Sequence, residues 1–203
     1  MGLDISYYPS VKRIPDEEVP EGVEAFNREY EEWEKSRFNE GNNNYLYYLD
    51  PDRGYFGGHM KGIEPGWYEV PRDDSGINYF RAGSYSGYNT WRNDLALAAG
   101  YEGGADEVWS MGDRLYEPDS PPFLELINFS DAEGIIGPDI SKKLYNDFVN
   151  YENKVKQEVD NWYLKIHPEK AYGVDDTKWF LSKYEDWKKA FEAASKGGFV
   201  SFH

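Results

Sequence analysis

The side chains best suited to bind a ligand lie between Tyr79 and Arg92, where a strand is expected to end, a glycine-rich turn to follow and a helix to begin. Amide groups in the first turn of a helix have no partner within the helix, so together with neighbouring hydroxyls they favour an anion such as a phosphate. Arginines add positive charge there, and tyrosine rings can stack on a flat ligand. The candidate ligand-binding residues of this stretch are Arg81, Ser84, Tyr85, Ser86, Tyr88, Asn89 and Arg92.

Two carboxylates, Asp131 and Glu133, follow the apolar run at residues 123–129 and form a second polar group. If that run and the run ending at Arg81 are neighbouring parallel strands, both turns lie at one edge of the sheet, where ligands of open helix–sheet folds commonly bind. Carboxylates accept hydrogen bonds from a base or a ribose. The sequence therefore predicts donors for a phosphate beside acceptors for a nucleotide-like molecule.

A purely structural interpretation of the same residues stays open. Ser86 is expected to cap the helix, the glycines to shape the turn, and the aromatic rings to pack in the core. Apolar residues recur after Ser86 at spacings of three and four, which gives the helix one buried face, and Gly100 is expected to end it.

Signals for catalysis are weak. The chain contains no cysteine, which excludes a thiol nucleophile, disulfides and thiolate metal sites. His59 and His203 have no partners at the spacing of a zinc site or a catalytic triad, and no phosphate-loop, nucleotide-fold or nucleophile-elbow motif occurs. We therefore expect no metal, no cofactor and no catalytic residue. The alternative is a hydrolase in which Asp131 or Glu133 acts with one of these histidines as acid–base partner.

The elements that position these groups follow from the apolar pattern. Strands are expected at Leu3–Tyr8, at Phe123–Phe129 in the centre of a sheet, and over the last five residues. Helices are expected at Val23–Phe38, Pro138–Trp162 and Asp176–Lys196, and the last two are expected to form a hairpin. This pattern predicts an α+β fold, with a small mixed β-sheet packed against a few helices that include a long C-terminal helical hairpin.

The chain of 203 residues is expected to form a single domain spanning residues 1–203. Residues at about 39–78 are expected to be an irregular excursion rich in aromatic residues and glycine, because many turn signals interrupt them. The aromatic side chains of this excursion either cover a ligand or attach the excursion itself to the core. They are Tyr55, Phe56, Trp67 and Tyr68.

The net charge of −16 arises in the first two-thirds of the chain, since residues 1–138 hold 11 basic and 27 acidic side chains and residues 139–203 hold 11 of each. A field of this sign disfavours direct contact with nucleic acid or an anionic membrane. Residues 16–37 hold nine acidic and three basic side chains, which indicates a solvated helix face or a surface that binds a protein by imitating nucleic acid. No spanning segment or secretion signal is recognised, so a soluble, cytoplasmic protein is expected.

Four blocks of the sequence resemble a family of uncharacterised bacterial and phage proteins. The blocks are the opening Met-Gly-Leu-Asp-Ile, residues 80–92, residues 129–138 and the terminal Phe-His. The resemblance names no activity, but it implies that the opening strand, the 84–89 turn, the 131–133 turn and His203 meet in one place. His203 is therefore added to the candidate ligand-binding residues. Family members often carry a cysteine where Asp131 or Ala132 stands, and this chain has no thiol there.

The favoured function is binding of a small phosphorylated, nucleotide-like ligand, as in a phage protein that sequesters a host immune signal. Two alternatives remain, an acidic inhibitor that binds a protein partner and, less favoured, the hydrolase. A homo-oligomer or a host protein partner is open as well, because fold and composition do not decide function.

Overall fold

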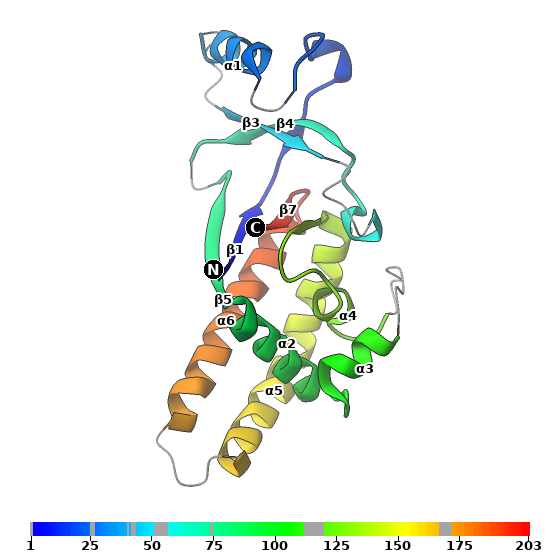
Figure 1. Ribbon diagram of the computed structural model, residues 1–203, viewed down its shortest axis with the longest axis vertical. Helices are drawn as coiled ribbons and strands as arrows, with labels where there is room; N and C mark the ends of the chain where they lie inside the picture. Colours follow the sequence, from blue (N-terminus) through cyan, green and yellow to red (C-terminus); the bar gives the residue numbers. More distant parts are fainter. Residues whose placement is uncertain are drawn as a thin grey trace.

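The computed structural model describes residues 2–24, 27–39, 41, 44–50, 57–73, 75–111, 120–166 and 172–203. Within them the chain forms two small antiparallel β-sheets packed with helices, and two long C-terminal helices run side by side (Figure 1). The predicted α+β class and the C-terminal helical hairpin are therefore confirmed. The strands are β1 (Gly2–Tyr8), β2 (Lys12–Arg13), β3 (Asn44–Leu49), β4 (Gly66–Pro71), β5 (Asn78–Ser84), β6 (Gly134–Ile136) and β7 (Phe199–Phe202). The helices are η1 (Asp16–Glu18), α1 (Arg28–Asn39), η3 (Gly57–Met60), α2 (Tyr85–Ala99), α3 (Gly104–Ser110), α4 (Leu124–Ile127), α5 (Pro138–Ile166) and α6 (Tyr172–Ala194).

The first sheet has the strand order β5-β1-β7-β6, and these neighbours pair in antiparallel fashion. Its inner strand β1 alternates as the sequence predicts. Leu3, Ile5 and Tyr7 are buried in the core that the helices share, so Asp4 and Ser6 lie on the opposite face. The expected strands at residues 3–8 and at the C-terminus are confirmed, but the described strands form an antiparallel sheet instead of a mixed one.

Helices α5 and α6 cover one face of the first sheet with aromatic side chains. Phe180, Tyr184, Trp187 and Phe191 of α6 are fully buried and recur at spacings of three and four. Burial of a side chain of this size stabilises the fold by roughly 1.5–3 kcal/mol. Tyr184 also donates its hydroxyl to the Phe148 carbonyl of α5 at 2.6 Å, which joins the two helices through a buried hydrogen bond.

The second sheet has the strand order β2-β4-β3 and lies at the opposite end of the molecule from the tip of the helical hairpin (Figure 1). Helix α1 packs on one of its faces through Trp33, which meets Trp67 edge to face at 5.3 Å between ring centres. This helix begins at Arg28, later than the expected Val23. The two sheets meet where Tyr47 of β3 lies against Phe199 of β7, at 5.2 Å between ring centres.

The excursion at residues 39–78 is more regular than expected, because it contains β3 and β4, which pair with each other. Trp67 and Tyr68 are buried in the two cores on either side of this sheet. They therefore pin the segment to the core and do not cover a ligand. Tyr55 and Phe56 lie outside the described residues.

The predicted central strand at residues 123–129 is wrong, because these residues hold the short helix α4. Phe123 precedes it with a left-handed backbone, at a φ of 57°, and turns the chain into the helix. Leu124, Leu126 and Ile127 are buried as a central strand would have been. A short and mostly apolar run has no period that distinguishes a buried strand from a buried helix, so contacts from elsewhere decide its backbone.

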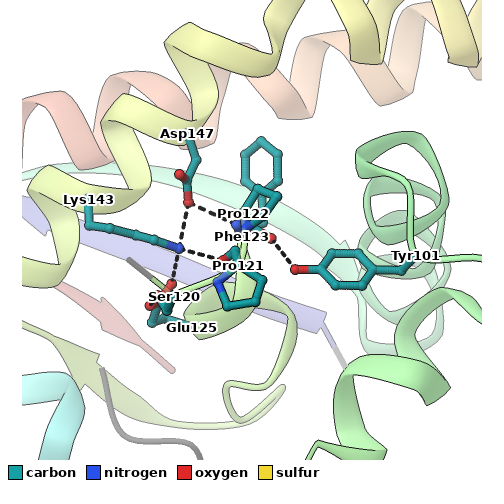
Figure 2. A network of polar contacts seen from close by, with 8 residues as sticks. All are labelled: Tyr101, Ser120, Pro121, Pro122, Phe123, Glu125, Lys143 and Asp147. Atoms are coloured by element: carbon teal, nitrogen blue, oxygen red, sulfur yellow. Dashed lines mark hydrogen bonds and ion pairs between the residues drawn. The ribbon is translucent and has the colours of Figure 1, made fainter. Parts of the chain in front are cut away.

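A buried lysine of α5 makes these contacts (Figure 2). The Lys143 ammonium lies 2.7 Å from the Pro121 carbonyl, 2.7 Å from Glu125 Oε2 and 2.8 Å from Asp147 Oδ2, which uses its three protons. Asp147 also accepts from the backbone N–H of Phe123 at 2.8 Å. The turn before α4 is thus tied to α5 by satisfied polar groups. Two further bonds in Figure 2 run from Ser120 to Glu125 and from Tyr101 to the Pro122 carbonyl.

Replacing Lys143 with methionine is expected to lower the free energy of unfolding by about 3–5 kcal/mol, because the carboxylates of Glu125 and Asp147 would stay buried without their cation. Urea denaturation at neutral pH measures the loss. The matched control is Lys142→Met, since Lys142 is exposed and its replacement should cost less than about 0.5 kcal/mol. Equal losses in both variants would show that the network does not hold the turn.

The same network predicts a pH dependence. Burial raises the pKa of Asp147 above its ordinary 3.8, against the opposing effect of Lys143. The folded state therefore binds this proton more tightly, so the contribution to stability is complete below the unfolded pKa and is lost as the pH rises through the folded pKa. Relative to Asp147→Asn, which does not titrate, the wild-type protein should lose stability between about pH 4 and about pH 7. Denaturation of both proteins at both values measures this, and a constant difference would contradict it.

Candidate functional site

Helix α2 begins directly after β5 ends, and Ser84 caps it. Ser84 Oγ accepts from the backbone N–H of Gly87 at 3.0 Å, so the expected cap at Ser86 is wrong by two residues. Both serines are good caps, and the choice follows from where β5 ends. Ser84 and Ser86 are exposed, and their hydroxyls lie 3.2 Å apart. Gly100 ends the helix in the left-handed conformation, at a φ of 110°, as expected.

The 84–89 turn and the 131–133 turn meet in the structure. Asn89 Nδ2 donates to Asp131 Oδ2 at 2.7 Å. The route differs from the expected pair of parallel strands, since α4 leads the chain back to α2. Arg92 holds it there by donating from Nη1 to the carbonyls of Ile127 at 3.3 Å and Phe129 at 2.7 Å.

A row of polar residues crosses the adjoining end of the first sheet. Arg81 of β5 lies opposite Asp4 of β1, and its Nη1 donates to Asp4 Oδ1 at 3.2 Å. Asp4 and His203 exchange two backbone hydrogen bonds, of 2.9 and 3.0 Å. The register of β6 on β7 places the exposed Glu133, which precedes β6, beside His203. Sequence reasoning missed Asp4, although the alternation of β1 had already put it on the polar face.

The aromatic candidates of the site belong to the core. Tyr88 is 0% exposed and packs against Trp91 and Trp187, at 6.2 and 5.7 Å between ring centres, so its ring is not available to stack on a ligand. Tyr85 is half-buried and packs on the same core. Arg92 is 7% exposed, and its guanidinium lies 5.3 Å from the centre of the Tyr88 ring.

Three polar atoms at the start of α2 are buried and have no hydrogen-bond partner among the described residues. They are Tyr88 Oη, Asn89 Oδ1 and Arg92 Nε. Burial raises the pKa of the Tyr88 hydroxyl, and the nearby Arg92 opposes this shift. Buried polar groups in native proteins are nearly always paired. Three unpaired atoms within five residues of one helix therefore make this a candidate position for a polar ligand.

The two candidate histidines, His59 and His203, have different surroundings. The His203 imidazole lies on Ser6, at 2.8 Å between Nε2 and Oγ. His59 is buried and packs against Phe129 at 4.9 Å between ring centres. In the part of the chain that the structure describes, no three histidine, aspartate or glutamate side chains are grouped so that they could hold a metal ion. The described helices also include none with the length and apolar character to cross a bilayer.

Comparison of the chain with models of protein families, with curated proteins and with solved structures found no match in any of the three. The functional argument therefore rests on the geometry of the site.

The Tyr88 hydroxyl gives a direct test of the unpaired group. Tyr88→Phe is expected to raise the free energy of unfolding by about 1 kcal/mol, because it removes a buried hydroxyl that has no partner in the described structure. Tyr184→Phe is the matched control, since Tyr184 is equally buried but donates to a carbonyl, and its loss should cost about 1 kcal/mol. Denaturation of both variants in urea measures the effects. Destabilisation of equal size in the two would show that Tyr88 is bonded.

Proposed function

We propose that the protein binds a small phosphorylated, nucleotide-like ligand at the end of the first sheet where α2 begins. The observation that carries the proposal is the hydrogen bond between Asn89 and Asp131, which joins the glycine-rich turn to the carboxylates of the 131–133 turn. Donors suited to a phosphate and acceptors suited to a base or a ribose thereby adjoin each other.

The phosphate end of the site is the start of α2. This helix of 15 residues has no acidic residue in its first turn, so no side chain of the turn itself opposes the positive end of the helix. The exposed hydroxyls of Ser84 and Ser86 lie at that end. Arg81 is next to them on β5 with a side chain that is 59% exposed, so its guanidinium can turn from Asp4 to a bound anion.

The dimensions fit a mononucleotide. Ser86 and Asn89 are three residues apart on α2, which separates them by about 5 Å along the helix axis. A phosphate at the first turn and a ring that reaches Asn89 and Asp131 therefore lie within the length of one nucleotide.

The proposed function is binding without conversion of the ligand, and it assigns no role to the contacts of the histidines with Ser6 and Phe129. A protein of this kind lowers the free concentration of a nucleotide signal. The resemblance to phage proteins suggests that such a signal belongs to host defence.

Thermal denaturation in the presence of single nucleotides and cyclic nucleotides at about 1 mM tests this function. A ligand at 100 times its Kd should stabilise the fold by about 2.7 kcal/mol. Arg81→Ala is expected to weaken binding by about tenfold in calorimetry, because a charge-assisted hydrogen bond to the phosphate is lost. The control Arg28→Ala removes an exposed arginine from α1 and should leave the Kd unchanged. Absence of stabilisation by every nucleotide would overturn the proposal.

A further inference from the structure

The polar groups at the start of α2 that a ligand could pair comprise two acceptors and two donors. The acceptors are Asn89 Oδ1, which is buried and has no partner among the described residues, and the carboxylate of the half-buried Asp131, which accepts from Asn89 Nδ2 through Oδ2. The donors are the N–H of Arg92 Nε and the hydroxyl of Tyr88, which lack acceptors within the same residues. A partner that satisfies all four groups must present neighbouring donors next to an acceptor.

Guanine carries that pattern along one edge. Its ring N1–H and its 2-amino group are adjacent donors that one carboxylate can take together, and the O6 beside them is an acceptor. Adenine and cytosine offer a single amino donor next to ring acceptors, and uracil places its N–H between two carbonyls. The other common bases would therefore leave at least one of the four groups unpaired.

We propose that this site takes the guanine edge of the ligand, an inference that rests on the proposed function. Asp131 accepts from N1–H and from one proton of the 2-amino group, and Asn89 Oδ1 accepts the other proton of that group. Arg92 and Tyr88 donate to O6. The phosphate then lies at the start of the helix, on the side of Ser84.

In the structure the unpaired atoms of Tyr88, Asn89 and Arg92 are buried, so a ligand reaches them only after the chain around them moves. The hydrogen bond between Asn89 Nδ2 and Asp131 Oδ2 joins the 131–133 turn to α2. Entry of the ring exchanges this bond for bonds from guanine to Asp131. Buried polar atoms without partners are unfavourable, so a guest that pairs all of them shifts the population toward the bound arrangement.

Calorimetry with four monophosphates, GMP, IMP, AMP and XMP, tests the inference. GMP is expected to bind at least about tenfold more tightly than either IMP or AMP. IMP lacks the 2-amino group, and a bidentate pair distinguishes bases to this degree. Tyr88→Phe should weaken GMP binding although it stabilises the fold. A merely structural tyrosine would not show this combination.

Asp131→Asn should change the base preference of the site from guanine toward xanthine. The variant is expected to lose about tenfold in affinity for GMP and to gain affinity for XMP, because an asparagine N–H can donate to the xanthine O2 that replaces the amino group. A gain cannot result from misfolding. The matched control is Asp106→Asn, an exposed change on α3, which should keep the wild-type order.

The outcomes separate the two proposals. Similar affinities for all four nucleotides, or no gain for XMP in Asp131→Asn, would overturn the guanine inference and leave nucleotide binding standing. Failure of all four to bind would overturn the guanine inference too, while stabilisation by another nucleotide in the thermal screen would still support the proposed function.

Discussion

The hydrogen bonds from Arg92 to the carbonyls of Ile127 and Phe129 are the constraint on which the site depends. These carbonyls lie at the end of a short helix, where backbone acceptors have no partner within the helix. The guanidinium pairs them and ties α4 to α2. Asp131 follows Phe129 by only two residues, so the position of its carboxylate relative to α2 is set by this tie. The Phe129 ring also packs on Phe202 at 4.5 Å, which helps to align the following strand with β7.

Two buried cations of this protein are used in different ways. Lys143 has an acceptor for each proton, and its network holds a left-handed turn and a short helix in place. Arg92 is buried to a similar degree, but its Nε and two neighbouring polar atoms have no partner in the described structure. A satisfied network makes one backbone arrangement specific, whereas unpaired groups are costly and persist where something else compensates them. The contrast distinguishes a structural cluster from a candidate binding cluster within one core.

Sequence patterns predicted the long elements because each has one buried face. The alternation of β1 and the aromatic stripe of α6 are both readable without knowledge of their neighbours. Residues 123–129 have no such asymmetry, and their backbone depends on Lys143, which follows later in the chain. The cap at Ser84 depended on the end of a strand, which patterns locate only to within a few residues. The role of Asp4 depends on the register between strands that are distant in sequence. The sequence pattern therefore predicted that Asp4 lies on the polar face, but it did not predict its partners.

The capping role of Ser84 and a ligand role for the same turn are compatible. Its hydroxyl satisfies the N–H of Gly87, which is one of several first-turn amides. In a chain with a net charge of −16, a polyanion such as nucleic acid would meet acidic surface along its length. A small anion experiences mainly what lies within the screening distance of about 8 Å, and there the helix start and Arg81, which is paired with Asp4, can donate hydrogen bonds to it. The proposed binding of a single nucleotide is therefore compatible with a net charge that disfavours contact with a nucleic acid strand.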